Sequence, residues 1–161
     1  MAWSNPVFDR TQEDVDTAIA QIEAWKAAQI DGLSVVVTEL KGCRNLSDLN
    51  RIENNILFLE NKLSSLHYPP GTRSKTWGIE GLPSLADIQR ILNNVQLIID
   101  AYFQFDDAPM IPEAMLNYTE INAVEENLYL IKMLLDGMES YFRKSGTFKC
   151  GSDRLLPMWR G

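Results

Sequence analysis

The sequence predicts an all-α fold, namely a bundle of about four repeated amphipathic helices with long connections and an irregular C-terminal arm. Three observations predict it. Apolar residues recur at alternating steps of three and four, capping residues precede each run, and short stretches of the chain resemble one another. Alternating steps keep apolar residues on one side of a helix and favour coiled-coil-like packing.

The first predicted helix spans residues 12–29. Thr11 followed by Asp14 is typical of a capping box, in which a side chain and a backbone N–H satisfy each other at the start of a helix. The apolar stripe of this helix is short. It consists of Val15, Ala18, Ile22 and Trp25.

Three further helices are predicted over residues 47–66, 84–104 and 119–143, and each begins with a residue that can accept a backbone N–H. The expected caps are Ser47, Ser84 and Thr119. The three stripes are longer than the first. They consist of Leu49, Ile52, Ile56, Leu59, Leu63 and Leu66; of Ile88, Ile91, Val95, Ile98, Tyr102 and Phe105; and of Ile121, Val124, Leu128, Ile131, Leu135, Met138 and Phe142.

The starts of the helices resemble one another. Residues 45–55 read N-L-S-D-L-N-R-I-E-N-N, and residues 117–127 read N-Y-T-E-I-N-A-V-E-E-N. Aligning the acidic residues of the four starts gives offsets of 34, 39 and 33 residues, which indicates one supersecondary unit used several times. The aligned residues are Asp14, Asp48, Asp87 and Glu120.

Three asparagines share one position in this alignment: Asn55, Asn94 and Asn127. Asparagine is an indifferent helix former, so its recurrence calls for an explanation. One hypothesis is a buried amide that fixes helix pairing through hydrogen bonds. The other is an exposed polar surface, and the sequence leaves both open.

Two glutamates also recur, Glu53 and Glu125, and they flank the apolar stripes. Metal sites in helix bundles use glutamate together with Glu-x-x-His motifs, and neither glutamate has a histidine partner. A solvated or capping role is therefore the favoured interpretation, and no metal site is predicted.

No catalytic constellation is found in the sequence. His67 is the single histidine and precedes a Tyr-Pro-Pro turn, so neither a general base nor a metal ligand is predicted there. Cys43 and Cys150 are far apart without a CxxC motif, and two free thiols are favoured over a long-range disulfide. Phosphate-binding and dinucleotide-binding motifs are absent, so we expect a non-enzymatic protein without a cofactor.

The chain has 161 residues, of which 45% are hydrophobic, and this is enough for one packed domain. We expect an extended N-terminal segment (1–10), a helical-repeat domain (11–143) and a C-terminal arm (144–161). Fifteen basic residues against twenty-two acidic ones give a net charge of −7, which disfavours a nucleic-acid partner. Neither a membrane span nor a secretory signal is expected from the apolar pattern.

The C-terminal arm differs from the rest of the chain in charge. Residues 143–161 carry five basic residues and one acidic residue, a net charge of +4, which leaves −11 for the remainder. Glycines and a proline prevent a continued helix there. The arm either folds back on its own bundle or reaches a neighbouring subunit. Its candidate partner-binding residues are Phe148, Lys149, Arg154, Leu155, Leu156, Met158, Trp159 and Arg160.

Three stretches of the sequence resemble small virion proteins of phages and prophages of Gram-positive bacteria. They are the opening from Trp3 to Val15, the segment from Leu40 to Ile56 with its Asp-x-Asn-Arg-Ile-x-x-Asn pattern, and the ending from Phe142 to Gly151. The resemblance implies a structural protein of the tail, baseplate or tail-fibre region. It also implies that the protein is present in the virion, and in the host cytoplasm during assembly.

Two classes of function follow as expectations. The first is a virion structural protein that forms a homo-oligomer and binds other virion proteins through helical packing and the C-terminal arm. The alternative is a helical adaptor or regulatory protein that binds a partner helix in a groove.

Overall fold

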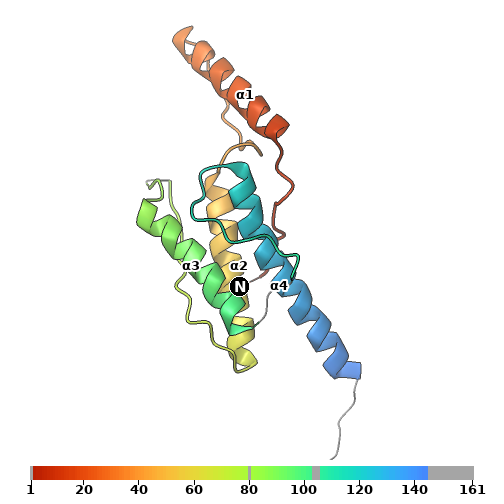
Figure 1. Cartoon of the computed structure of the whole chain (residues 1–161). Helices are drawn as coiled ribbons and strands as arrows, with labels where there is room; N and C mark the ends of the chain where they lie inside the picture. Colours follow the sequence, from red (N-terminus) through yellow and green to blue (C-terminus); the bar gives the residue numbers. More distant parts are fainter. Residues whose placement is uncertain (1, 80, 103–105, 145–161) are drawn as a thin grey trace, which may run out of the picture.

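The computed structural model describes residues 2–79, 81–102 and 106–144, and these form four α-helices without a strand (Figure 1). The all-α prediction is confirmed. The predicted helix ends agree to within one residue, except that the third helix ends three residues early. The helices are α1 (Gln12–Ile30), α2 (Leu46–Ser65), α3 (Leu85–Ala101) and α4 (Tyr118–Lys144).

Two of the predicted caps are confirmed. The side chains of Thr11 and Ser84 accept the backbone N–H groups of Asp14 and Asp87, and both carboxylates accept the cap N–H in return. These reciprocal pairs satisfy backbone donors that a helix start leaves without intrahelical partners.

The two other predicted caps, Ser47 and Thr119, are wrong. The cap of α2 is Asn45, and the α4 cap position is taken by Asn117, whose side-chain oxygen accepts the N–H of Glu120 at 3.0 Å. Asparagine is as good a cap as serine, and each asparagine precedes the predicted residue by two positions. Helices α2 and α4 therefore start one residue earlier than predicted.

Helices α2, α3 and α4 pack against one another in all three pairs and form a bundle. They run in the same direction (Figure 1). Arg51 of α2 binds Glu125 of α4, and Lys62 binds Asp136 eleven residues further along both helices. The predicted stripes of these helices line the core. Its buried members include Leu49, Ile52, Ile56, Leu59, Leu63, Ile88, Ile91, Val95, Ile98, Ile121, Val124, Leu128, Ile131 and Leu135.

Helix α1 lies beyond the end of the bundle at which α2 and α4 begin (Figure 1), and Ala18 is its one buried residue. The arrangement thus differs from the predicted bundle of four repeated helices. The stripe of α1 is short and includes an alanine, so it has less apolar area to bury than the stripes of the other helices. Gly42 holds the chain close to α1, where a Cβ atom on it would lie 2.6 Å from the Cα of Val15.

Because the bundle helices are parallel, the chain must return to the same end of the bundle between them. Helix α3 has 17 residues and is therefore about 26 Å long, a distance that eight or nine extended residues cover. Three segments without helix or strand are hydrogen-bonded to the helices of the bundle. We call them the first strap (residues 3–10), the second strap (residues 72–77) and the third strap (residues 109–116).

No helix in the described ranges is both long enough and apolar enough to cross a bilayer. Most of the expected C-terminal arm, residues 145–161, lies outside the described residues, and the first ten residues contain no helix where they are described.

Candidate functional site

The three matched asparagines are buried, each with at most 2% of its surface exposed, and each binds the backbone of a strap. Asn55 donates to the carbonyl of Ser4 at 2.8 Å and accepts its N–H at 3.0 Å. Asn94 holds both backbone groups of Arg73 in the same way, at 2.9 and 3.1 Å. The third, Asn127, donates to the carbonyl of Pro109 at 2.8 Å and to a carbonyl of its own helix. These hydrogen bonds connect helices to straps.

A second set of amides binds the opposite ends of the straps. The Asn50 side chain accepts the N–H of Trp77 at 2.8 Å and donates to its carbonyl at 3.1 Å. The amides of Asn122 and Gln89, at the same aligned position in α4 and α3, donate to the carbonyls of Arg10 and Glu113, both at 2.9 Å. Each strap is thus held by one amide from each of the two helices that flank it.

The interpretation of Glu53 and Glu125 as solvated or capping residues is wrong. Glu53 is 2% exposed and Glu125 is 0% exposed. A buried carboxylate costs several kcal/mol unless it is paired and hydrogen-bonded, and both of these are. The signal that could have revealed the pairing is a second recurrence: Arg51 and Arg90 also share an aligned position.

Glu125 is the centre of the first ionic cluster. Its oxygens accept hydrogen bonds from Arg51 at 2.7 and 2.9 Å, from Arg10 at 3.2 Å, and from the N–H of Val7 at 2.7 Å. Asp48 completes the cluster with contacts to Arg10 at 2.8 Å and to Arg51 at 2.5 Å. The cluster ties the first strap to α2 and α4.

Glu53 is the centre of the second ionic cluster. It binds Arg90 at 2.5 and 3.1 Å, the indole N–H of Trp77 at 3.2 Å, and the N–H of Lys75 at 3.1 Å. Arg90 also donates to the carbonyl of Arg73 at 2.6 Å. This cluster ties the second strap to α2 and α3, as the first cluster does for the first strap.

Both arginines at the matched position keep their charge. Burial lowers the pKa of Arg51, but hydrogen bonds and charge from Glu125 and Asp48 outweigh burial, and the net pKa is raised. The hydrogen bond to Glu53 raises the pKa of Arg90. A guanidinium group is protonated at all ordinary pH values, so the arginines of both clusters always carry a positive charge.

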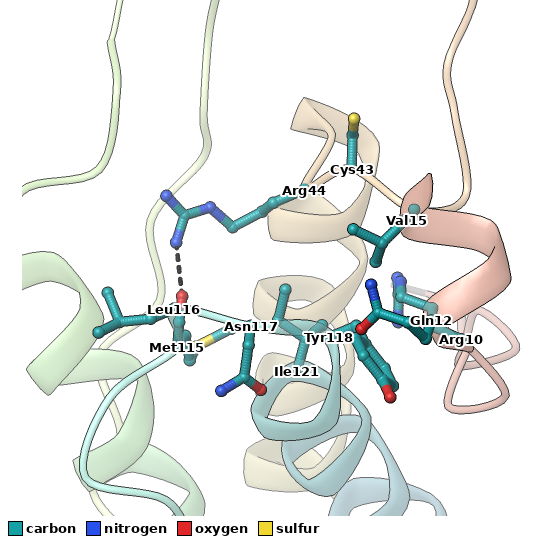
Figure 2. Close-up of a pocket in the computed structure, with 11 residues that line it drawn as sticks. Arg10, Gln12, Val15, Cys43, Arg44, Met115, Leu116, Asn117, Tyr118 and Ile121 are labelled. Atoms are coloured by element: carbon teal, nitrogen blue, oxygen red, sulfur yellow. Dashed lines mark hydrogen bonds between the residues drawn. The ribbon is translucent and has the colours of Figure 1, made fainter. Parts of the chain in front are cut away.

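A cavity of about 330 Å³ lies where the first strap and Gly42 meet the start of α4 (Figure 2). Arg44 donates to the carbonyl of Met115 at 2.9 Å across one side of it. The Cys43 sulfur points away from the other labelled residues (Figure 2). Within this described part of the chain, the lining contains neither a histidine nor a carboxylate to serve as a base. Its titratable side chains are those of Arg10, Cys43, Arg44 and Tyr118.

A larger cavity of about 570 Å³ lies beside the start of α2 and is mainly apolar. Ile79 and Leu82 on its rim are 96% and 94% exposed. Its other lining residues are Arg44, Asn45, Leu46, Leu49, Gly78, Gly81 and Pro83.

His67 has a structural role at the end of α2. Its φ is +68°, and its N–H bonds to the carbonyl of Ser64, while the N–H of Tyr68 bonds to the carbonyl of Leu63. These two bonds form a Schellman motif, in which the residue after the helix is left-handed and is usually glycine. The position ends the helix, and the imidazole is exposed.

The predicted partner-binding residues from Phe148 to Arg160 lie outside the described residues, as does Cys150. Cys43 is half-buried and carries a free thiol. Within the described ranges, no group of three or more acidic, histidine or cysteine side chains is arranged to hold a metal ion.

Comparison with known proteins finds no matching family model, no matching curated protein and no matching solved structure.

Proposed function

We propose that this chain is a non-enzymatic structural protein of the tail, baseplate or tail-fibre region of a phage. It assembles with copies of itself and with other virion proteins. The resemblance of three stretches of its sequence to small virion proteins supports the location in the particle.

The observation that supports a structural role is that the buried polar side chains bind the backbone of the straps. Asn55, Asn94 and Asn127 bind strap backbone, and Glu53 and Glu125 accept strap N–H groups while pairing with arginines. Buried ionic groups often belong to active sites. In this protein they bind the backbone of the straps and so hold the straps against the helices. Buried hydrogen-bonded networks rigidify a fold, and a rigid fold suits a structural component of a particle.

Particle composition tests the proposal. Purified particles from a host that carries the gene should contain the chain in a fixed ratio to the major tail protein, measured by quantitative mass spectrometry. An in-frame deletion of the gene should yield particles with defective tails, and a plasmid copy should restore them. A chain found in the cell lysate and missing from particles would overturn the proposal.

A second candidate, a helical adaptor, is favoured by the apolar cavity of about 570 Å³ beside α2. Its exposed rim residues Ile79 and Leu82 could receive the apolar face of a partner helix. An adaptor would be monomeric by itself and missing from particles, so the same composition measurement separates the two candidates.

A further inference from the structure

Residues 11–40, which we call the α1 projection, expose several large apolar side chains. They contain α1 and the start of the segment that follows it (Figure 1). Several large apolar side chains exposed on one segment are typical of an interaction site. The side chains and their exposed fractions are Ile19 51%, Ile30 85%, Leu33 63%, Val36 79% and Val37 67%.

The α1 projection is also acidic. It contains six acidic residues and one basic residue, Lys26, and so has a net charge of −5. Two such projections would repel each other, which disfavours a symmetric contact between the α1 helices of two copies. The charge favours an occupant that is both apolar and basic. The six acidic residues are Glu13, Asp14, Asp16, Glu23, Asp31 and Glu39.

The end of this chain has that composition. Residues 145–161 contain three basic residues and one acidic residue, a net charge of +2. Their large apolar residues are Phe148, Leu155, Leu156, Met158 and Trp159.

The arm cannot reach the α1 projection of its own chain with enough length left to dock. Helix α4 ends at Lys144, at the end of the bundle opposite α1 (Figure 1). Its 27 residues make it about 40 Å long, so about twelve extended residues are needed to travel back along it. Only about five of the seventeen residues would then remain, and Phe148 would lie far from α1.

We propose that the C-terminal arm of one copy docks on the α1 projection of the next copy, so that the chains assemble head to tail. The basic residues of the arm face the acidic α1 surface, and its apolar residues cover the exposed side chains. A head-to-tail contact of this kind forms a ring if its rotation closes and a filament if it does not. The inference rests on the proposed assembly role and specifies the contact that performs it.

A charge-swap experiment on the full-length chain tests the contact. The first variant reverses the arm with Lys149→Glu, Arg154→Glu and Arg160→Glu. The second reverses the acceptor with Asp16→Lys, Glu23→Lys and Asp31→Lys, which changes the net charge of the α1 projection from −5 to +1. A control matched to the second variant, with Asp106→Lys, Asp107→Lys and Glu113→Lys, makes the same charge change of +6 at exposed positions outside both surfaces. Circular dichroism verifies that every variant keeps its helices.

Light scattering after size-exclusion chromatography should show the unmodified chain and the control as oligomers, and each reversed variant by itself at the monomer mass of 18.3 kDa. An equimolar mixture of the two reversed variants should recover the oligomer mass, because each acidic arm then meets a basic acceptor. A merely structural effect of the substitutions would not be rescued by mixing. A mixture that stays monomeric would overturn the inference, as would an unmodified chain that is monomeric at all concentrations.

The result separates this inference from the proposed function. A chain that is present in particles but shows no rescue on mixing keeps its virion role and loses the arm contact. Rescue on mixing with a chain that is missing from particles supports the arm contact and contradicts the virion role.

Discussion

The side chain of Asn94 binds Arg73 as a neighbouring β-strand would. Its Nδ2 donates to the Arg73 carbonyl at 2.9 Å, and its Oδ1 accepts the Arg73 N–H at 3.1 Å. A buried backbone segment must find partners for its N–H and C=O groups, and here helix side chains supply what a sheet would otherwise supply. The straps can therefore be extended without belonging to a sheet.

Asn94→Leu should destabilise the protein by about 2–4 kcal/mol, because it leaves the N–H of Arg73 without its partner and places an apolar group against polar backbone. Urea unfolding followed by circular dichroism measures this. The control is Asn93→Leu, an exposed neighbour, which should change stability by less than about 0.5 kcal/mol. Equal effects of the two changes would contradict the strap role. The hypothesis of pure helix pairing expects Asn94→Leu to preserve stability.

Glu125→Gln should destabilise the protein by about 3 kcal/mol, since it removes the charge that two partly or fully buried guanidinium groups share. Chemical denaturation at neutral pH gives the free energy of unfolding. The sequence neighbour Glu126→Gln is the matched control and should be close to neutral. A small effect of Glu125→Gln would mean that Asp48 alone satisfies both arginines.

His67→Gly should stabilise the protein by about 1 kcal/mol, because His67 has a φ of +68°. This left-handed conformation is unfavourable for a residue with a Cβ atom and is not unfavourable for glycine. Thermal unfolding should show a higher midpoint. His67→Ala retains a Cβ and should show no such gain, which separates backbone strain from any effect of losing the imidazole.

Asp87 should contribute stability that disappears in acid. The Ser84 hydroxyl, then Lys75, and then the Ser84 N–H lower the pKa of this carboxyl from 3.8 to about 2. Because the folded-state pKa lies below the unfolded one, the contribution is complete above about pH 4 and is lost as the pH falls towards 2. The difference in denaturation midpoint between the unmodified chain and Asp87→Asn should therefore be constant at higher pH and shrink between pH 4 and 2. A difference that does not change with pH would exclude the carboxylate as its source.

Gly42→Ala should displace the α1 projection without unfolding the bundle. A Cβ atom at this position would overlap the backbone of Asp14 and Val15, which cannot move aside as a side-chain end can. Hydrogen exchange should increase in residues 12–40 and remain unchanged in residues 46–65. Gly78→Ala is the control, since a Cβ atom there meets nothing within 4 Å.

The long helices and the core were predictable from the sequence because burial imposes a period on apolar residues. Leu59 and Leu128, for example, belong to stripes long enough to specify both the helix and its inward face. Helix α1 was misjudged because the position of Asp14 suggested a fourth equivalent helix. Its residue at the position aligned with the three buried asparagines is Gln21, which is exposed, so α1 lacks the buried amide that holds a strap.

The straps and the ionic clusters could not be predicted from periodicity. An extended segment held by side chains leaves no period in its own sequence, and the partners of Ser4 and Val7 lie 51 and 118 residues away. The burial of Glu125 conflicts with the usual cost of burying a charge. Only the three-dimensional neighbours, Arg10 and Arg51, explain why it is tolerated.

The first strap also sets an order of events during synthesis. It is made before the helices that hold it, and two of its partners, Asn122 and Glu125, follow the residues that they bind by 112 and 118 positions. At about 5–20 residues per second, the ribosome needs about 6–24 s to add the 118 residues that separate Val7 from Glu125. The first strap must therefore remain without these partners for that time, and it can dock only after the start of α4 has been made.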